Sequence, residues 1–136
     1  ERTYEGEPAM KLEAAAMKGK DVLRLKPIIE SDTLNTTELV LEIFENREKC
    51  AIHDLAFSAH SYLAKGLAEL AIEKALENGL KTVGFSGGVA CNEIFVKIMR
   101  ETVEAAGLKF LVHEMVPPGD GGLSFGQAFA AGFSPS

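Results

Sequence analysis

Cysteine is scarce in this chain of 136 residues, which contains only Cys50 and Cys91. Two thiols cannot build the disulfide framework of a small secreted domain, and they are too few for a structural zinc site. No apolar run approaches the roughly 20 residues that a membrane-spanning helix needs. Positive charge is also in deficit, because 20 acidic residues oppose 14 basic ones and the net charge is −6. We therefore expect no membrane partner and no broad nucleic-acid-binding surface.

The sequence also lacks internal repeats, an initiator methionine and any pattern typical of a signal peptide. Its hydrophobic share of 46% and charged share of 25% are those of a folded globular chain. Its length fits one domain. We therefore predict a single domain over residues 1–136, which is a C-terminal fragment of a larger multidomain protein and lies in the cytoplasm.

Hydrophobic spacings of three and four residues predict helices, and short apolar runs predict strands. We expect helices over residues 8–18, 35–47, 50–78, 94–106 and 123–132. We expect strands over residues 22–29, 82–85 and 109–112. The order strand, helix, strand, helix after residue 80 indicates a parallel strand pair joined by a right-handed crossover. The predicted fold class is therefore α/β, with a short parallel sheet flanked by helices.

Two loops, residues 86–92 and 113–122, leave the carboxyl ends of the predicted parallel strands. Such loops open on the same edge of a sheet, where open α/β sheets bind ligands. Gly87 and Gly88 allow a ligand to approach the backbone, and the following helix N-terminus favours an anion such as phosphate. Asn92 can cap that helix or hydrogen-bond a ligand. The residues alone leave two interpretations open, a generic turn and a phosphate cradle.

Asp120 stands in the second loop between prolines and glycines. A carboxylate held there can bind a hard cation or cap the last helix, and one carboxylate cannot complete a metal site. His53 and His60 lie seven residues apart on one helix, about 10.5 Å along its axis, which is too far to share a metal ion. We expect a core-edge or surface role for both histidines, and a strand-end pair for His113 and Glu114.

Three segments occur together in an order that identifies a family. They are Tyr4-Glu5-Gly6-Glu7-Pro8 with the residues up to Glu13, Ser86-Gly87-Gly88-Val89-Ala90-Cys91-Asn92, and Val116-Pro117-Pro118-Gly119-Asp120-Gly121-Gly122 with the residues up to Ala128. The chain resembles the C-terminal end of the HypF family, the carbamoyltransferases of nickel–iron hydrogenase maturation. The Ser86–Asn92 segment is also similar to the related tRNA threonylcarbamoyladenosine synthase family.

The resemblance implies a partial RNase H-like lobe of an actin-like ATPase (ASKHA) domain, the second of two lobes. In the family, ATP and carbamoyl phosphate give carbamoyl-adenylate, and the carbamoyl group passes to the C-terminal cysteine of HypE. The implied cofactors are ATP and a divalent metal. The implied partners are the first lobe and upstream domains of the same protein and a HypE-like acceptor protein.

The resemblance also implies functional residues. The nucleotide-binding candidates are Ser86, Gly87, Gly88 and Asn92, with Glu5 and Gly6 on the ribose side. The metal-binding candidate is Asp120, and the other metal ligands of the family lie outside this chain. With half of the cleft, the chain alone is expected to be inactive.

Two parts of the sequence depart from the family pattern, and these departures leave alternative functions open. Ala90-Cys91 replaces the usual Phe-Gln and is closer to the tRNA-modifying relatives, while Gly119 replaces the usual Asn before Asp120. The alternative functions are therefore a tRNA threonylcarbamoyl-transfer subunit and a non-catalytic α/β module that docks a partner protein.

Overall fold

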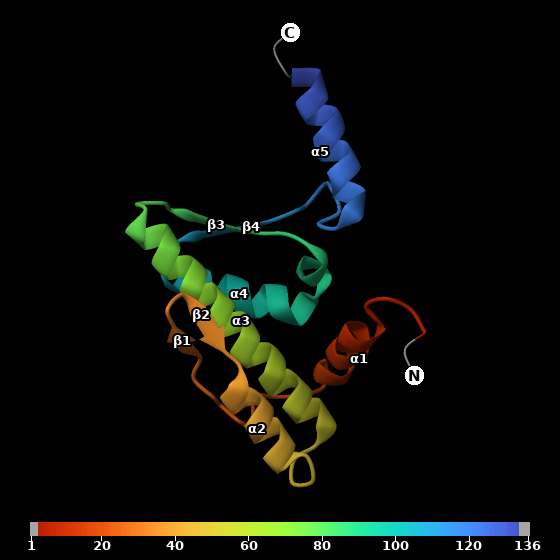
Figure 1. The fold of residues 1–136 in the computed structure, drawn as a ribbon, viewed down its shortest axis with the longest axis vertical. Coiled ribbons are helices and arrows are strands. Elements are labelled where there is room, and N and C mark those ends of the chain that lie inside the picture. The colour runs from red at the N-terminus through yellow and green to blue at the C-terminus, as the bar shows by residue number, and fades with distance from the viewer. Residues whose placement is uncertain (1–2, 134–136) are drawn as a thin grey trace.

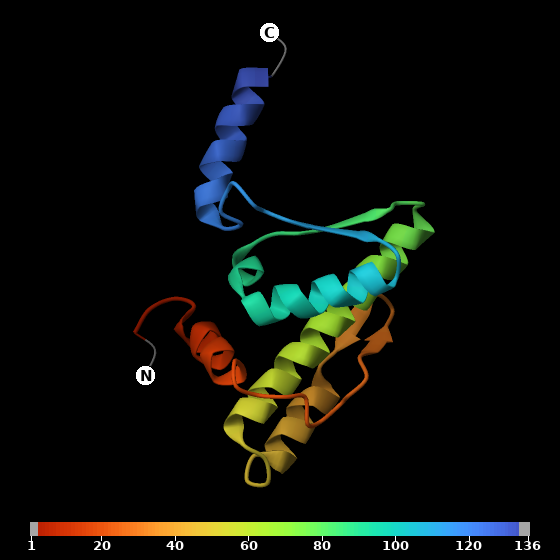
Figure 2. The ribbon, with the colours of Figure 1, turned by 180° about the vertical axis from the view of Figure 1, so that it is seen from behind.

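The computed structural model describes residues 3–133 (Figure 1). Its elements are α1 (Glu7–Ala16), β1 (Ile28–Glu30), β2 (Thr33–Asn35), α2 (Thr37–Asn46), α3 (Ile52–Glu77), β3 (Thr82–Phe85), the short 3₁₀ helix η1 (Gly88–Cys91), α4 (Glu93–Ala105), β4 (Lys109–Val112) and α5 (Asp120–Phe133). The long helix α3 crosses the molecule, and α4 lies between it and the β3–β4 pair. Seen from behind, α1, η1 and the start of α5 lie on the same side (Figure 2). No helix in the described range is long and apolar enough to cross a membrane.

The predicted parallel sheet is confirmed. β3 and β4 pair in parallel, with Val83 opposite Phe110, and both of these side chains are buried. Their neighbours Gly84 and Leu111 are exposed, because successive side chains of a strand point to opposite faces. One face of this sheet therefore packs on helices, and the other is open.

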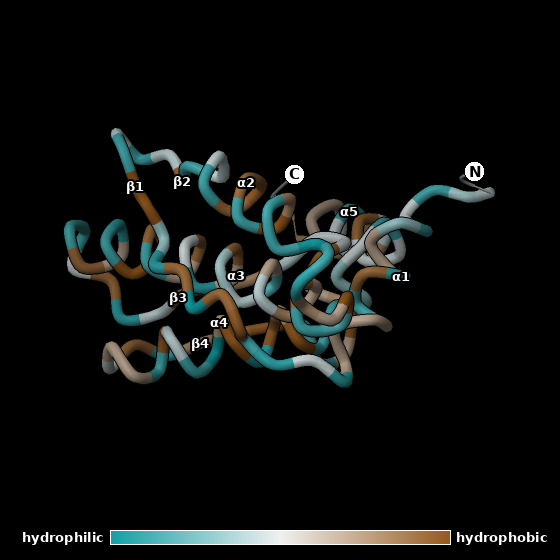
Figure 3. Tube along the Cα trace, turned by 90° about the horizontal axis from the view of Figure 1, so that it is seen from below, coloured by the Kyte–Doolittle hydropathy of each residue, from teal (hydrophilic) through white to brown (hydrophobic). Residues whose placement is uncertain are grey.

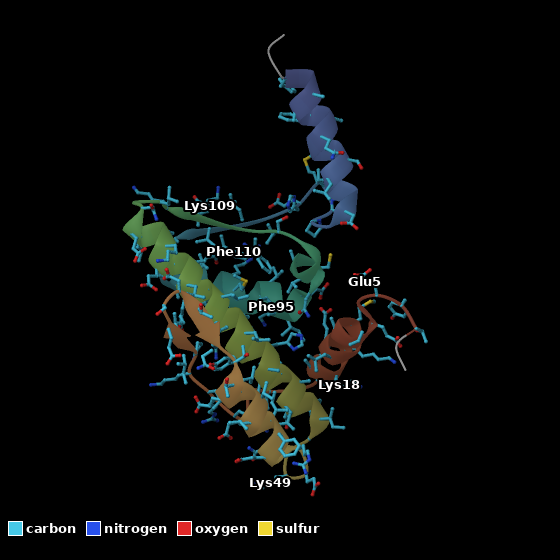
Figure 4. The ribbon with its side chains drawn as sticks, in the orientation of Figure 1. Glu5, Lys18, Lys49, Phe95, Lys109 and Phe110 are labelled. Atoms are coloured by element: carbon cyan, nitrogen blue, oxygen red, sulfur yellow. The ribbon has the colours of Figure 1, made fainter. Side chains whose placement is uncertain are left out.

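The hydrophobic core joins α3, α4, β3 and β4. Small side chains of α3, including Ala64 and Ala68, are fully buried and let α4 approach closely. Phe95 of α4 and Phe110 of β4 lie between the sheet and α3 (Figure 4). The ring of Phe85 stacks on both, with centroid distances of 5.9 and 6.3 Å. Hydrophobic stretches accordingly recur along α3, α4 and the two strands (Figure 3). This core holds the carboxyl ends of the strands in place.

The strand predicted over residues 22–29 is largely wrong, since only its last two residues, 28 and 29, are extended in β1. The backbone N–H groups of Val22 and Leu23 donate instead to the Ser58 hydroxyl of α3, at 3.0 and 3.3 Å. The N–H of Lys20 likewise donates to Asp54 of α3. Side chains of α3 thus accept the backbone hydrogen bonds that a neighbouring strand would accept if this segment were part of a sheet.

Asp21 secures the same segment. Burial opposes ionisation of its carboxyl group, but hydrogen bonds from the Ser61 hydroxyl and the Arg24 N–H outweigh burial. The pKa of Asp21 is therefore below its ordinary value. The segment that follows α1 is fixed to α3 by these contacts.

We predict that Ser58→Ala lowers the free energy of unfolding by about 2 kcal/mol, because it leaves two backbone donors without their acceptor. The Ser58 side chain is 2% exposed, so water cannot readily replace it. Urea unfolding followed by circular dichroism measures the change. Ser124→Ala, at an exposed position of α5, is the matched control. Equal stability of the two variants would contradict the prediction.

The hairpin formed by β1 and β2 was not predicted as such. Its turn residues, Ser31 and Asp32, both have positive φ angles of 50° and 62°. The buried Tyr62 hydroxyl accepts from the Ile28 N–H and donates to the Asn35 carbonyl, which ties both strands to α3. A Cβ atom at Gly66 would lie 2.5 Å from Leu34, so the absence of a side chain at this position lets β2 approach α3 closely. The hairpin depends on contacts with residues about 30 positions away.

Candidate functional site

The two loops that follow the parallel strands meet, as the sequence predicts. The Gly87 N–H donates to the Pro118 carbonyl at 2.9 Å. The Ser86 hydroxyl lies 2.7 Å from His113 Nε2 and 3.4 Å from the same Pro118 oxygen. His113 therefore bonds to Ser86, and His113 and Glu114 lie at the end of β4, as expected. These bonds join the carboxyl ends of β3 and β4 into one edge.

A groove of about 530 Å³ lies between α1 and η1. It is lined by Gly6, Ala9, Met10 and Glu13 on one side and by Gly88, Val89, Cys91 and Asn92 on the other. We call this the α1–η1 groove. Three residues predicted to share a site, Gly6, Gly88 and Asn92, thus lie together, although Gly6 is more than 80 positions from the other two. The lining is mainly apolar, with a few polar groups, which is typical of small-molecule sites.

The other predicted nucleotide residues lie beside this groove and do not line it. Ser86 borders a smaller pocket on the sheet with Phe85 and His113. Gly87 joins the two loops through its bond to Pro118. Glu5 lies on the loop that leads into α1 (Figure 4).

Gly87 has φ 95° and ψ 179°, a backbone conformation that is almost restricted to glycine. It lies two residues after β3 and begins the turn into η1. In the described part of the chain, the N–H groups of the next two residues, Gly88 and Val89, have no hydrogen-bond partner. Both residues line the α1–η1 groove. The backbone therefore offers two donors beside an otherwise apolar surface.

Asn92 caps α4, which is one of the two roles expected for it. Its Oδ1 accepts from the Phe95 N–H at 2.9 Å. The expectation that the N-terminus of α4 presents free N–H groups to a phosphate is wrong. Three of its first four N–H groups already have acceptors, in Val89 for Asn92, in Glu13 for Glu93 and in the Asn92 side chain for Phe95. Of these four groups, only the Ile94 N–H lacks an acceptor among the described residues.

Glu13 is a site residue that the sequence did not reveal. Its Oε1 accepts from the Glu93 N–H at 2.8 Å, across 80 positions of sequence. The bond attaches α1 to the start of α4 and so fixes one wall of the groove to the other. No local pattern could have identified this pair, because each residue reads as an ordinary exposed helix residue.

The two histidines of α3 differ from each other. His53 is half exposed and lies 3.6 Å from Asp54, which confirms its expected surface position. His60 is 5% exposed. Its Nδ1 lies 2.8 Å from the Ala56 carbonyl and its Nε2 lies 3.0 Å from Asn92 Nδ2. His60 therefore touches a residue that lines the groove.

Asp120 is the first residue of α5 and is exposed. Its carboxylate makes no hydrogen bond or ion pair within residues 3–133, so the expected cap hydrogen bond is not observed. A negative charge in the first turn still favours the helix. No three His, Cys, Asp or Glu side chains in the described range gather as a metal site. A carboxylate suits a hard cation, but Asp120 can be only one of several ligands.

Comparison with known proteins places this arrangement in a family. A family model described as "Carbamoyltransferase, Kae1-like Domain, second subdomain" matches residues 1–127. The chain belongs to this family. The resemblance to HypF proteins is thereby confirmed, and the α/β fold is the ASKHA type of the HypF Kae1-like domain.

Curated relatives agree with this assignment. The chain is 39% identical to the probable carbamoyltransferase HypF of Methanocaldococcus jannaschii, over 96% of this chain and 17% of that protein. It is 30% identical to the carbamoyltransferase HypF of Rhizobium leguminosarum bv. viciae, over 91% of this chain and 16% of that protein. The chain thus spans about a sixth of the HypF proteins it matches. A tRNA N6-adenosine threonylcarbamoyltransferase of Nostoc punctiforme is 32% identical over 59% of the chain.

Two solved HypF structures have the same fold. The crystal structure of T. kodakarensis HypF superimposes with a TM-score of 0.85 and 48% identity, covering 96% of this chain and 17% of that one. A full-length HypF in the phosphate- and nucleotide-bound form gives a TM-score of 0.82 and 25% identity, covering 96% and 18%. The arrangement of α1, η1 and the two strands is therefore embedded in a HypF-type fold.

Proposed function

We propose that this chain is the second subdomain of a HypF-type carbamoyltransferase and that it binds ATP in the α1–η1 groove. The observation that carries the proposal is the groove itself, where Gly6, Gly88 and Asn92 come together beside two unpaired backbone N–H groups. Apolar lining suits a purine base, and backbone donors suit phosphate oxygens. A HypF relative of the same fold has been solved with phosphate and nucleotide bound.

The proposed reaction is that of the family. ATP, carbamoyl phosphate and water give carbamoyl-adenylate, phosphate and pyrophosphate. The carbamoyl group then passes to a C-terminal cysteine thiol of a HypE-like acceptor, and AMP leaves. The residues of this chain bind and orient the nucleotide, while the rest of the cleft comes from the first lobe and upstream domains. The expected location remains the cytoplasm.

The family resemblance also implies a divalent metal, and Asp120 is the ligand that this chain can offer. Its carboxylate is exposed and free of other partners among the described residues, so a cation can reach it. The remaining ligands would come from outside this chain. When bound, such a cation would polarise phosphoryl or carbonyl oxygens.

The tRNA threonylcarbamoyltransferases are the alternative, because two of them match about half of the chain. Two HypF proteins match 91–96% of it, and two others match 53–57%. The net charge of −6 also disfavours a tRNA contact by this lobe. Incubation of the full-length protein with a HypE-like acceptor and with tRNA, followed by mass spectrometry of both, distinguishes the two acceptors.

We predict that Ala9→Trp, which fills the groove from α1, weakens ATP binding by about tenfold or more. Isothermal titration calorimetry of the full-length protein measures the dissociation constant. Ala14→Trp is the matched control, because Ala14 is exposed on the same helix and does not line the groove. The proposal fails if both variants bind ATP as tightly as the unaltered protein.

Helix α5 supports the proposed partnership with the first lobe. None of its described residues is buried, and it projects from the body of the molecule (Figure 1). Phe125, Phe129 and Phe133 are spaced four residues apart and are 57–74% exposed, with 4.5 Å between the last two rings. A stripe of this kind is typical of a surface that another element covers. We propose that the first lobe covers it.

We predict that the isolated chain self-associates through this stripe and that Phe125→Ser combined with Phe129→Ser restores a monomer. Removal of two large exposed rings leaves too little apolar area for a stable contact. Sedimentation velocity over a concentration series measures the change, with Gln127→Ser as the control on the same helix. A monomeric unaltered chain at high concentration would contradict the prediction.

A further inference from the structure

His60 occupies a position that the proposed function does not explain. It lies inside α3, is 5% exposed, and both of its ring nitrogens have partners. Nδ1 lies 2.8 Å from the Ala56 carbonyl oxygen, which can only accept a hydrogen bond. Nδ1 therefore carries the proton, and in the neutral ring Nε2 is an acceptor.

The acceptor at Nε2 determines how the Asn92 amide is oriented. Asn92 Nδ2 lies 3.0 Å from Nε2 and donates to it, while Asn92 Oδ1 accepts from the Phe95 N–H. A flipped amide would set an oxygen against the Nε2 lone pair and an NH₂ group against an N–H. Only one orientation of the amide satisfies all of these atoms.

An amide nitrogen carries two hydrogens, and His60 accepts one of them. No other partner of Asn92 Nδ2 occurs in the described part of the chain. Asn92 lines the α1–η1 groove together with Gly88 and Val89, whose N–H groups are also unpaired. The fixed amide thus adds a third donor, held in one orientation, to the two backbone donors.

We infer that His60 is a positioning residue for the nucleotide: it holds the Asn92 amide so that its second N–H donates to a phosphate or ribose oxygen in the groove. The inference rests on the proposed function of that groove. His60 itself does not line the groove, so it acts through Asn92 and does not touch the ligand. Preorganisation of this kind strengthens binding because the donor loses no rotational freedom when the ligand arrives.

The test compares two substitutions in the full-length protein. His60→Met has a similar length and no acceptor for the amide, whereas His60→Gln places an amide oxygen near the position of Nε2. We expect His60→Met to weaken ADP binding about tenfold, and His60→Gln to stay within about threefold of the unaltered protein. His53→Met, on the exposed part of the same helix, is the control and should bind ADP normally. Equal affinities for His60→Met and the unaltered protein would overturn the inference.

A double-mutant cycle separates this inference from the proposed function. Asn92→Ala should weaken ADP binding about tenfold, and adding His60→Met should change it less than about twofold further. If Asn92→Ala leaves ADP binding unchanged, the proposed role of the groove fails. If Asn92→Ala weakens ADP binding and His60→Met alone does not, the proposed role of the groove is retained and the positioning role of His60 is refuted.

One further measurement does not depend on the folding of any variant. Nitrogen-15 NMR of the histidine rings in the unaltered protein reports which nitrogen carries the proton. We expect Nδ1 of His60 to be protonated and Nε2 to be unprotonated. A ring protonated at Nε2 would be unable to accept from Asn92 and would overturn the inference.

Discussion

Asp120→Asn is expected to lower carbamoyl transfer by the full-length protein about 100-fold or more, because an amide replaces the carboxylate that we propose as a metal ligand. The substitution keeps the size of the side chain and removes its charge. Asp120 is exposed in the first turn of α5, so little stability should be lost. Mass spectrometry of a HypE-like acceptor measures the transferred carbamoyl group, and elemental analysis measures bound metal.

Glu114→Gln is the matched control for this prediction, since Glu114 is an exposed carboxylate in the same loop. We expect it to retain both activity and metal. Full transfer activity and full metal content in Asp120→Asn would show that Asp120 is not a metal ligand. A non-catalytic docking module, the remaining alternative, would show neither activity nor any effect of the substitution.

Gly87→Ala is expected to weaken nucleotide binding about 10- to 100-fold, because a side chain forces the backbone out of its present conformation at a cost of about 1–3 kcal/mol. No atom lies within 4 Å of the added Cβ, so strain and not collision causes the effect. Rotation of this residue would break the bond between the Gly87 N–H and Pro118 and displace the donors of Gly88 and Val89.

The control for Gly87→Ala is Gly84→Ala in β3. There the added methyl group also meets no atom within 4 Å, and the φ angle is not positive. Calorimetric titration with ADP should therefore show a large loss for Gly87→Ala and almost none for Gly84→Ala. Equal dissociation constants would mean that the turn into η1 does not position the nucleotide.

The parts of the fold that the sequence predicted are those encoded by local patterns. The apolar runs at residues 82–85 and 109–112 gave both parallel strands, and the spacing of Phe95, Ile98 and Val103 gave α4. The glycines after β3 gave the turn. Each of these signals lies within about ten residues, so periodicity and turn chemistry are sufficient.

The features that escaped prediction depend on contacts between distant segments. The apolar residues Val22 and Leu23 resemble a strand, but the Ser58 hydroxyl, 35 and 36 positions away, takes their N–H groups. The hairpin of β1 and β2 has strands of three residues, too short for an alternating pattern to show, and Tyr62 holds it in place.

The candidate site shows the same division. Gly88 and Asn92 could be selected because they follow a strand and begin a helix. The residues that contact this segment could not be selected from the sequence. Glu13 bonds to Glu93 across 80 positions, and His60 bonds to Asn92 across 32. A buried histidine and a half-buried glutamate have no sequence signal that distinguishes them from ordinary helix residues.

Because the Glu13–Glu93 bond joins α1 to α4, a ligand in the α1–η1 groove should also stabilise the packing of α1 on the rest of the protein. One wall of the groove belongs to α1, near residue 10, and the other to η1, near residue 90. A molecule bound between them therefore contacts both segments. Its binding free energy then stabilises the conformation in which α1 is packed against the rest of the protein. The amino-terminal helix, which already contacts α3 and Glu93, should therefore be held more firmly when the groove is filled.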